Sequence, residues 1–408
     1  MSIAPLHLAA RVAVALPLLI WLYLLCARGG FWRASRQLND ADPQACGPDC
    51  APATAMAPAT AVVAVIPARN EADSIGAAVT SLLEQRLAGS LHVIVVDDGS
   101  TDGTAEAALL AAESTGATGT DPASRLTVIR GAALPPGWTG KLWAMAQGVD
   151  AAAALDPDYL LFTDADIVHE PDNLAALVAN ARTHHRDLVS YMVLLSVRTL
   201  AERCLIPAFV FFFLKLYPPR WIAAPGSATA GAAGGCMLIR PQALQRIGGL
   251  AALRGQIIDD CALAHAVKRA GGRIWLGLTH SAHSLRRYGT FAEIGSMISR
   301  TAFNQLRHSY LLLAGTLLGL AVTYLAPPLL LLLRGDPLAM GCGAAAWALM
   351  SACYLPMVRF YRLSPLWSLC LPAIAAFYAG ATAHSALQYR LGRGGNWKGR
   401  VQDSRARA

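Results

Sequence analysis

In the segment LLFTDADIV (160–168), an apolar run is followed by two aspartates, Asp164 and Asp166. An Asp-x-Asp pair after a strand presents two carboxylates across a tight turn, and Mg²⁺ and Mn²⁺ prefer such oxygen ligands. These metals usually keep coordination positions open for substrate phosphates. Taken alone, Asp164 and Asp166 are explained at least as well by a solvated turn.

Two further polar clusters follow strand-like segments. AVVAVI (61–66) runs into PARNE (67–71), and LHVIVV (91–96) runs into DDGSTDG (97–103). A tight turn and a helix cap explain part of the second cluster. They do not explain two adjacent carboxylates, Asp97 and Asp98, at the end of an apolar strand. A buried carboxylate there needs a hydrogen-bond donor, and the imide N–H of a uracil base would be one.

Alternating strand and helix patterns position these clusters. Apolar runs at 61–66, 91–96, 126–130 and 159–163 predict buried strands, and helical patterns at 72–86, 102–114, 139–153 and 171–183 follow them in turn. This alternation predicts an α/β domain with a mostly parallel sheet. Ligands bind at the carboxyl ends of such strands, so we expect the three polar clusters along one edge of one sheet.

The composition indicates that part of the chain lies in lipid. The 408 residues are 55% hydrophobic and 15% charged, with a mean hydropathy of +0.41, whereas soluble domains are about 25% charged. The formal charge of +8 gathers beside the apolar segments and in the tail, which suits anionic lipid headgroups rather than nucleic acid. The nearest cysteine pair, Cys46 and Cys50, lacks a second pair, so a zinc site is not expected.

The N-terminal segment 8–27 has the length of a membrane span. A cleaved signal peptide would need small residues after this segment, but arginines and aromatic residues follow it, so a retained anchor (1–30) is favoured. Arg28, Arg33 and Arg36 then place the next domain in the cytoplasm. An Ala- and Pro-rich linker (31–60) connects the anchor to a globular domain (61–308).

Three more apolar runs, 309–333, 338–357 and 365–388, form a C-terminal membrane region (309–390) before a basic tail (391–408). Three crossings would put the tail outside, whereas its cations, and Arg359 and Arg362 between the last two runs, favour the inside. We therefore expect one segment to be re-entrant or interfacial, with a cytoplasmic tail. The apolar stretch 204–216 is too short to span and should lie at the membrane surface or under the core.

Several ordered motifs resemble a known family. VAVIPARNEADSI, VIVVDDGSTDGT, FTDADIV, GCMLIRPQAL and IIDDCALAHAVKRAGGRI, within residues 62–307, resemble the family 2 glycosyltransferases of the GT-A fold. With its apolar termini and the WKGR tail (397–400), the chain is most similar to bacterial hopene-associated glycosyltransferases, relatives of the ceramide glucosyltransferases. The resemblance implies a Rossmann-like GT-A domain, a divalent metal (Mg²⁺ or Mn²⁺), a nucleotide-sugar donor and a lipid acceptor at the inner membrane.

The resemblance also implies a role for each motif residue. Asp260 matches the catalytic base, and Asp259 before it stands where the family has Glu. By themselves, these two acids could simply mark a helix N-terminus. Asp166 would coordinate the metal together with Asp164, and Lys141 would support the diphosphate. The uracil and ribose would contact Pro67, Arg69, Asn70, Glu71 and Asp98.

Other residues bear on the kind of transfer. Gly234 and Gly235 would let the sugar and the acceptor approach the backbone, although ordinary turn glycines are an equal alternative. Processive relatives carry Gln-x-x-Arg-Trp, where this chain reads MISRT (297–301), so Arg300 keeps the phosphate-binding part without the Trp. We therefore expect transfer of a single sugar. His280, His283 and His308 are predicted to be surface or interface residues.

The chemistry of inverting transfer needs both kinds of carboxylate, since one activates the acceptor hydroxyl and one holds the metal. A nucleotidyltransferase is an alternative, but it would carry a glycine-rich basic loop in place of PARNE (67–71). A non-catalytic membrane scaffold is a second alternative, which would have no reason to keep Asp98, Asp166 and Asp260 together.

Overall fold

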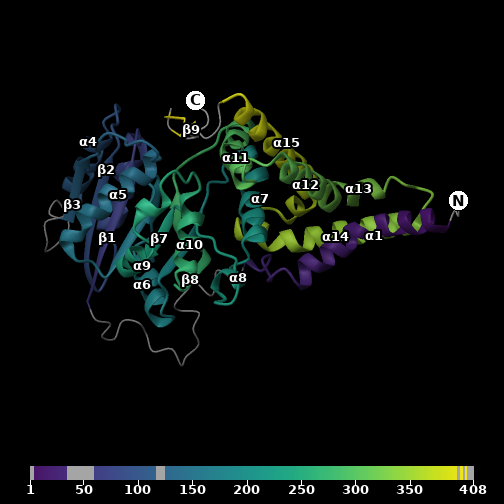
Figure 1. Ribbon diagram of the computed structural model, residues 1–408, viewed down its shortest axis with the longest axis horizontal. Helices are drawn as coiled ribbons and strands as arrows, with labels where there is room; N and C mark the ends of the chain where they lie inside the picture. Colours follow the sequence, from purple (N-terminus) through teal and green to yellow (C-terminus); the bar gives the residue numbers. More distant parts are fainter. Residues whose placement is uncertain (1–3, 35–58, 116–124, 393–395, 398–399, 402–408) are drawn as a thin grey trace.

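The computed structural model describes residues 4–34, 59–115, 125–392, 396–397 and 400–401 (Figure 1). Side chains are described for residues 11–34, 59–115 and 125–392. Most of the predicted linker, with Cys46 and Cys50, and most cations of the basic tail lie outside the described residues.

One eight-stranded sheet forms the centre of the globular part, in the order β3-β2-β1-β4-β7-β6-β8-β5. The pairs β3–β2, β2–β1, β1–β4 and β6–β8 are parallel, whereas β7 and β5 run antiparallel to their neighbours. The four predicted strands are thus present and parallel, and the sheet as a whole is mixed. The strands are β1 (Thr60–Ala68), β2 (Gly89–Asp97), β3 (Leu126–Arg130), β4 (Tyr159–Thr163), β5 (Ile167–His169), β6 (Leu188–Leu194), β7 (Cys236–Ile239) and β8 (Ile274–Ser284).

Helices cover both faces of this sheet, which explains why its central strands are apolar throughout. Successive side chains of a strand point to opposite faces. Val63 and Val65 of β1 therefore pack in one core cluster with helix α5, while Val62 and Ala64 pack in another with α3 and α4. All four predicted helices are confirmed. The helices around the sheet are α3 (Ala72–Leu83), α4 (Thr104–Ser114), α5 (Gly140–Ala152), α6 (Asn173–Thr183), α9 (Pro241–Arg246) and α10 (Asp259–Arg269).

A glycine sets how closely α5 approaches the sheet. A Cβ atom at Gly148 would lie 2.3 Å from Val65 Cγ1 and 3.2 Å from Val96 Cγ2. The helix therefore rests on β1 and β2 at a distance that only glycine permits. This contact fixes where α5 begins, and its first turn carries Lys141 at the carboxyl edge of the sheet.

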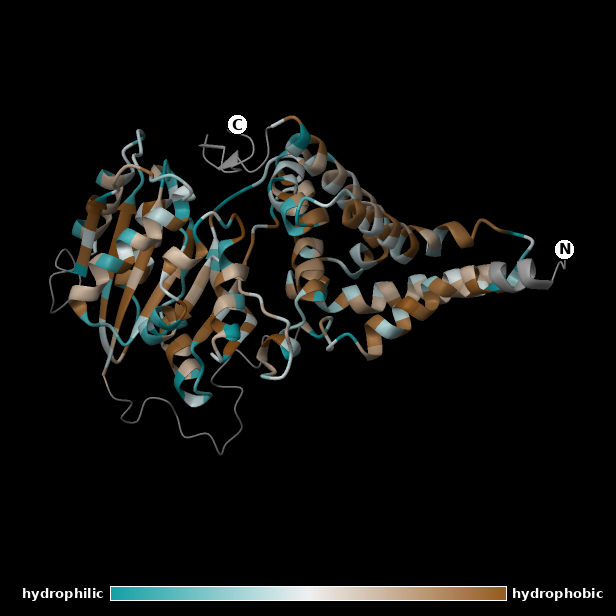
Figure 2. Ribbon diagram, viewed as in Figure 1, coloured by the Kyte–Doolittle hydropathy of each residue, from teal (hydrophilic) through white to brown (hydrophobic). Residues whose placement is uncertain are grey.

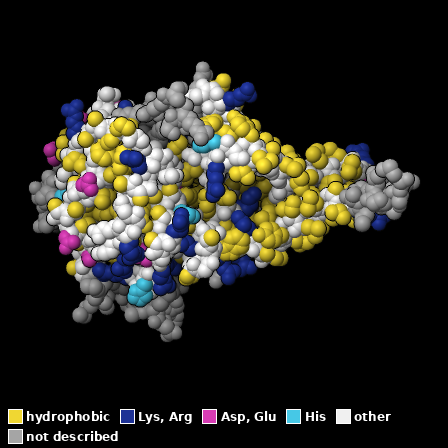
Figure 3. Space-filling view, in the orientation of Figure 1, with side chains coloured by type: hydrophobic (Ala, Val, Ile, Leu, Met, Phe, Trp, Pro, Cys, Tyr) yellow, Lys and Arg dark blue, Asp and Glu magenta, His cyan; other side chains and the backbone are white. Residues whose placement is uncertain are grey.

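An arm of apolar helices extends from the globular part (Figures 2 and 3). Among the described residues, three segments are long and apolar enough to cross a membrane: Tyr310–Leu330, Pro337–Phe360 and Pro365–Arg390. They match the three predicted runs. The helices of the arm are α1 (Ala4–Cys26), α12 (Tyr310–Leu320), a π-helical turn (Ala321–Leu325), α13 (Ala326–Leu330), α14 (Pro337–Phe360), a 3₁₀ turn (Pro365–Cys370) and α15 (Leu371–Arg390).

The N-terminal anchor stays a prediction. The part of α1 with described side chains, Arg11–Cys26, is a shorter apolar helix than the three C-terminal segments. Its last turn leads to Arg28, whose Nε donates to the Lys215 carbonyl oxygen at 3.1 Å.

Three helices join the arm to the sheet: α7 (Leu200–Leu216), α8 (Pro219–Ala223) and α11 (Phe291–Gln305). The buried residues Leu205, Val210 and Phe211 of α7 belong to the core cluster that also contains arm residues. Phe211, for example, packs edge-on against Tyr354 of α14 with ring centroids 5.1 Å apart. The stretch 204–216 therefore lies under the core, one of the two predicted positions.

The close packing of α5 predicts a stability effect. Gly148→Ala should lower the free energy of unfolding by about 1–3 kcal/mol, because the added methyl group overpacks against Val65. Gly76→Ala in α3 is the control, since its nearest atoms would be 3.7 Å away. Thermal unfolding midpoints in detergent compare the two variants. A Gly148→Ala midpoint at or above that of Gly76→Ala would contradict the packing argument.

Candidate active site

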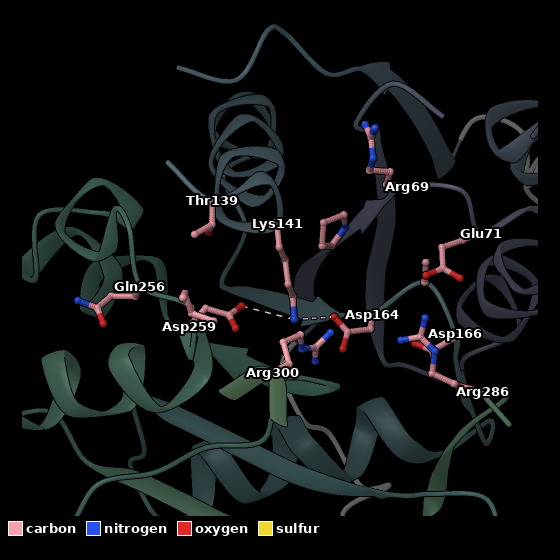
Figure 4. Close-up of a pocket in the computed structure, with 13 residues that line it drawn as sticks. Arg69, Glu71, Thr139, Lys141, Asp164, Asp166, Gln256, Asp259, Arg286 and Arg300 are labelled. Atoms are coloured by element: carbon pink, nitrogen blue, oxygen red, sulfur yellow. Dashed lines mark ion pairs between the residues drawn. The ribbon is translucent and has the colours of Figure 1, made fainter. Parts of the chain in front are cut away.

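The three polar clusters meet at one edge of the sheet, as predicted from the sequence. Strands β2, β1 and β4 are neighbours and parallel, with Ala68 paired to Asp97 and Val65 paired to Phe162. A cavity of about 130 Å³ opens at this edge (Figure 4). It is lined by Pro67, Arg69, Glu71, Thr139, Lys141, Asp164, Ala165, Asp166, Gln256, Ile257, Asp259, Arg286 and Arg300.

Lys141 lies at the centre of the cavity, between two carboxylates. Its Nζ is 2.7 Å from Asp164 Oδ1 and 3.4 Å from Asp259 Oδ2, as the dashed lines in Figure 4 show. Burial acts to lower the pKa of Lys141, but Asp164 and Asp259 outweigh it and raise that pKa overall. The ammonium therefore stays charged and joins a carboxylate from the end of β4 to one at the start of α10.

The Asp164–Asp166 turn forms a pair of carboxylates. The turn is closed by the Ile167 N–H, which donates to the Asp164 carbonyl oxygen at 3.2 Å. Asp166 Oδ2 accepts a hydrogen bond from Ser284 Oγ at 2.7 Å, which fixes its orientation. Burial raises the pKa of Asp164; Lys141 opposes this rise and the charge of Asp166 adds to it. The two like charges are thus close enough to repel, which a divalent cation would relieve.

This pair fits a hard cation only in part. Within the described part of the chain, no three or more His, Cys, Asp or Glu side chains are grouped to hold a metal. Asp164 and Asp166 alone supply two carboxylates. Mg²⁺ is commonly bound by one or two carboxylates plus substrate phosphates and water, so the pair suits a metal that arrives with a phosphorylated substrate.

Asp259 and Asp260 begin α10, so they do occupy a helix N-terminus. Asp260 is nevertheless tied to the site, because its Oδ2 accepts from the Gly234 N–H at 2.9 Å and its Oδ1 from the Cys261 N–H at 2.7 Å. Burial raises the pKa of Asp260 to about 6; the charge of Asp259 adds to this rise and Lys141 opposes it. The helix start therefore holds a carboxyl group that exchanges its proton near neutral pH.

The two predicted glycines lie beside these charged groups. A Cβ at Gly234 would be 3.3 Å from Lys141 Nζ and 3.4 Å from Asp260 Oδ2. The Gly235 carbonyl oxygen accepts from Thr163 Oγ1 at 2.9 Å, which ties this loop to the end of β4. Glycine at 234 thus lets the backbone approach both groups.

The loops after β1 and β2 are tied to one another. Arg69 Nη1 donates to the Asp98 carbonyl oxygen and lies 3.8 Å from Asp98 Oδ2, and the Asp98 side chain is only 5% exposed. Asn70 has a left-handed backbone (φ 50°) and its Oδ1 accepts from the Thr101 N–H at 2.9 Å. Arg69 Nε is buried and, among the described residues, has no hydrogen-bond partner. This donor is therefore left unsatisfied in the structure.

Asp97 and Asp98 have different surroundings. Asp97 Oδ1 accepts from the Ser100 N–H at 2.8 Å, which is the turn that the sequence already suggested. Asp98 instead faces Arg69 and is removed from solvent. The turn interpretation thus holds for Asp97 alone.

Most of the predicted site residues lie together. The cavity lining includes Pro67, Arg69, Glu71, Lys141, Asp164, Asp166, Asp259 and Arg300. The remaining predicted residues, Asn70, Asp98, Gly234, Gly235 and Asp260, are not part of the lining; Asp98 and Gly234 contact residues that are.

The cavity lining also includes Thr139, Gln256 and Arg286, which are not predicted from the sequence. Arg286 lies beside Asp166 in Figure 4. Burial acts to lower the pKa of its guanidinium, but Tyr288 and the nearby carboxylates of Asp166 and Glu71 raise it overall. The cation pair Arg286–Arg287 just after the apolar segment of β8 could have indicated this residue.

The segment 284–290 that carries Arg286 is held at both ends, and we call it the arginine strap. At one end the Leu285 N–H donates to the Asp166 carbonyl oxygen at 2.8 Å. At the other end Glu202 Oε1 accepts from the Tyr288 N–H at 2.7 Å, and Thr199 Oγ1 donates to the Tyr288 carbonyl oxygen at 2.9 Å. The strap thus connects the aspartate turn to the start of α7.

Comparison with known proteins agrees with this architecture. Residues 63–248 match the family described as Glycosyl transferase family 2. This part of the chain resembles a family 2 glycosyltransferase domain and has a GT-A-like mixed sheet, and the match supports a glycosyltransferase. The match argues against the scaffold alternative. Among curated proteins the sequence gives no match.

Three solved structures are similar to this chain. The mannosyltransferase PcManGT from Pyrobaculum calidifontis, in complex with GDP-Man and Mn²⁺, is 22% identical, with 92% of this chain and 99% of that chain covered and a TM-score of 0.50. Glucosyl-3-phosphoglycerate synthase from Mycobacterium tuberculosis, with Mn²⁺ and UDP-glucose, is 17% identical, with 61% and 78% covered and a TM-score of 0.37. TarS residues 1–349 from S. aureus, with UDP-GlcNAc, are 14% identical, with 83% and 95% covered and a TM-score of 0.37.

Because Glu202 holds one end of the arginine strap, we expect Glu202 to stabilise the protein. Glu202 is fully buried, and its Oε2 also accepts from the Arg198 and Thr199 N–H groups. Glu202→Gln should lower the free energy of unfolding by about 2–3 kcal/mol, since hydrogen bonds to a buried carboxylate are lost. Glu293→Gln is the matched control, because Glu293 stands at the same helix-start position of α11 but is exposed.

The effect of this variant should depend on pH. Burial acts to raise the pKa of Glu202, but hydrogen bonds from Tyr288, Thr199 and Ser196 outweigh it and lower that pKa overall. A lowered pKa contributes stability above the ordinary Glu value, and this contribution disappears as pH falls through the lowered pKa. The difference in unfolding midpoint between wild type and Glu202→Gln should therefore shrink in acid. A difference independent of pH would contradict the assignment.

Proposed function

We propose that this protein is a membrane-bound, inverting glycosyltransferase. It transfers one sugar from a nucleotide-sugar donor, UDP-linked, to a hydroxyl group of a lipid at the cytoplasmic face of the inner membrane. The observation that carries the proposal is the Lys141 bridge, which brings the Asp164–Asp166 turn and the Asp259–Asp260 helix start to one cavity. Metal-binding and base carboxylates are both required for this reaction.

The donor would lie along the strand ends. Asp98 and Arg69, at the ends of β2 and β1, would contact the uracil and ribose, and the partnerless Arg69 Nε supplies a donor there. Three cations that line the cavity, Lys141, Arg286 and Arg300, would surround the diphosphate. Asp166 and Asp164 would hold Mg²⁺ or Mn²⁺, which neutralises charge on the leaving diphosphate when bound.

Asp260 would act as the general base. A base works best when its pKa lies near the working pH, and burial raises the pKa of Asp260 to about 6. Asp260 would take the proton from the acceptor hydroxyl while the hydroxyl oxygen bonds to the anomeric carbon. The bond from that carbon to the diphosphate oxygen breaks on the opposite side, so the sugar is inverted and the nucleoside diphosphate leaves.

The lipid acceptor is supported by α11. This helix carries Arg300 into the cavity, while its Ser299 Oγ donates to the Ala381 carbonyl oxygen of α15 at 3.0 Å. The Phe303 N–H of α11 donates to Ser385 Oγ of α15, also at 3.0 Å. One helix thus contacts both the cavity and an apolar membrane segment, as a lipid-modifying enzyme requires. The narrower assignment to hopanoid glycosylation rests on the motif resemblance.

A nucleotide-sugar donor is also supported by the mannosyltransferase of the same fold, which was solved with a nucleotide sugar and Mn²⁺. That donor is GDP-linked, so a GDP-sugar belongs in any test. We retain UDP for this chain because of the motif resemblance, in which Asp98 after β2 would contact the uracil.

The transfer can be tested with purified protein in detergent, a panel of UDP-sugars and GDP-mannose, Mn²⁺ or Mg²⁺, and membrane lipid extract. We expect release of nucleoside diphosphate that needs both metal and lipid. Asp260→Asn should reduce it by at least about 100-fold, since general-base catalysis contributes about 10²–10⁴. Asp150→Asn, an exposed change on α5, should retain the wild-type rate. An active Asp260→Asn enzyme would refute the assigned base.

The pH dependence tests how Lys141 acts on the base. Because Asp260 must be ionised to accept a proton, kcat/KM should fall as pH drops below about 6. Lys141 lowers the pKa of Asp260, so Lys141→Met should raise that pKa and move the acid limb of the profile to higher pH. Asp150→Asn should keep the wild-type profile. An acid limb that stays in place in Lys141→Met would show that another group is titrating.

A further inference from the structure

The C-terminal apolar region (309–390) follows a path that differs from three successive crossings of a bilayer. Helix α12 begins beside the globular part, where Tyr310 packs against Phe303 of α11 with ring centroids 5.1 Å apart. Helices α12 and α13 lead outward, and α14 returns. Figure 1 shows the connection between α13 and α14 at the end of the molecule farthest from the sheet, beside the N-terminal end of α1. This connection (331–336) carries Arg334 and Asp336, both exposed, in its last three residues (334–336).

Helix α14 ends at the globular part. The Phe360 carbonyl oxygen is 3.1 Å from His280 Nε2 on β8, and the two rings are stacked with centroids 4.4 Å apart. This contact also confirms His280 as an interface residue. The chain has therefore gone out and back when it reaches residue 361, and the exposed Arg359 and Arg362 lie on the side of the sheet.

After residue 361, the chain runs away from the globular part again, alongside α14. Trp347 Nε1 donates to the Leu369 carbonyl oxygen at 3.2 Å. Trp347 precedes Phe360 by thirteen residues of one helix, which corresponds to about 20 Å along its axis. If the hydrocarbon layer begins at Phe360, Leu369 would lie about two-thirds of the way across its thickness of about 30 Å.

The outward turn (363–370) is built for an apolar surrounding. It contains no Asp, Glu, Lys or Arg, and its Leu366 and Leu369 side chains are 71% and 50% exposed. Ser368 Oγ donates to the Pro365 carbonyl oxygen, and the Trp347 indole satisfies the Leu369 carbonyl oxygen. Residues Pro365–Cys370 of the turn form a 3₁₀ helix, so backbone groups there are satisfied within the chain, as lipid surroundings require. The connection between α13 and α14 (331–336) also exposes leucines, Leu332 and Leu333, but it ends in the charged residues Arg334 and Asp336.

Helix α15 then returns to the globular part. Tyr378 Oη donates to the Leu205 carbonyl oxygen of α7 at 2.9 Å. Further along, Tyr389 stacks on His308 with ring centroids 4.2 Å apart, beside the start of α12. Arg390 follows as the last, exposed residue of the helix. Both ends of the segment 361–390 thus lie next to the globular part.

From these contacts we propose that residues 361–390 form a re-entrant loop, which enters the bilayer and returns on the side of the catalytic domain. Among the described residues of the C-terminal part, the α12–α13 unit and α14 would then be the only segments that cross the bilayer. The exposed Arg359, Arg362 and Arg390 then lie on the same face as the domain, which removes the charge conflict of three crossings. The inference rests on the membrane placement proposed above and is independent of the transfer chemistry.

Two epitope-tagged full-length chains test the path. One carries a short epitope after Ala408, and the other carries it within residues 334–336 of the connection. Antibody binding is compared on right-side-out and everted sealed vesicles, with detergent-opened vesicles as the control. The re-entrant loop predicts the two epitopes on opposite faces. Three crossings would put both epitopes on the same face, and that result would overturn the proposal.

A charge placed in the turn gives a second readout. Leu366→Arg puts a cation within the hydrocarbon if the loop is re-entrant, so folded protein in the membrane fraction should fall several-fold. Gly335→Arg, in the charged connection, should have little effect. Equal recovery of the two variants would count against the re-entrant loop. Neither readout uses the transfer reaction, so a failed activity assay would leave both results standing.

Discussion

The ion pairs of the partly buried Lys141 ammonium are the interactions on which the site depends. The ammonium lies between Asp164 and Asp259, carboxylates that belong to different elements and would repel without it. Buried charges are costly unless they are paired, so the start of α5 must lie within reach of both. Gly148 makes this possible, because it lets α5 rest closely on β1. Packing in the core thus fixes the electrostatics of the cavity.

The cavity is completed by segments that contact the membrane arm. The arginine strap is tied to Asp166 at one end and to Glu202 of α7 at the other, and α11 places Arg300 in the cavity while it packs on α15. Arg286 and Arg300 therefore come from segments next to the apolar arm, whereas Lys141 comes from α5 and the aspartates come from the end of β4 and from α10. In the proposed reaction, the lipid hydroxyl and the water-soluble donor would meet at this junction.

Several charged residues of the arm lie at its end next to the globular part. Arg28 contacts the end of α7, and Arg359, Arg362 and Arg390 lie at helix ends next to the globular part. The surface between these ends and the outer connection is almost wholly apolar (Figure 3). A bilayer placed around the arm would bury that surface and leave the cations at one headgroup layer.

The sequence by itself determined the strands β1 to β4, the helices after them, the three polar strand ends and the apolar C-terminal segments. These features follow from local periodicity and from the rule that parallel strands present their carboxyl ends together. Only the tertiary structure decided that Lys141 bridges Asp164 and Asp259, that Arg286 faces Asp166 and that residues 361–390 turn back. These depend on β7 pairing with β4, β8 with β6, and α15 with α11, contacts between distant residues that no local pattern specifies.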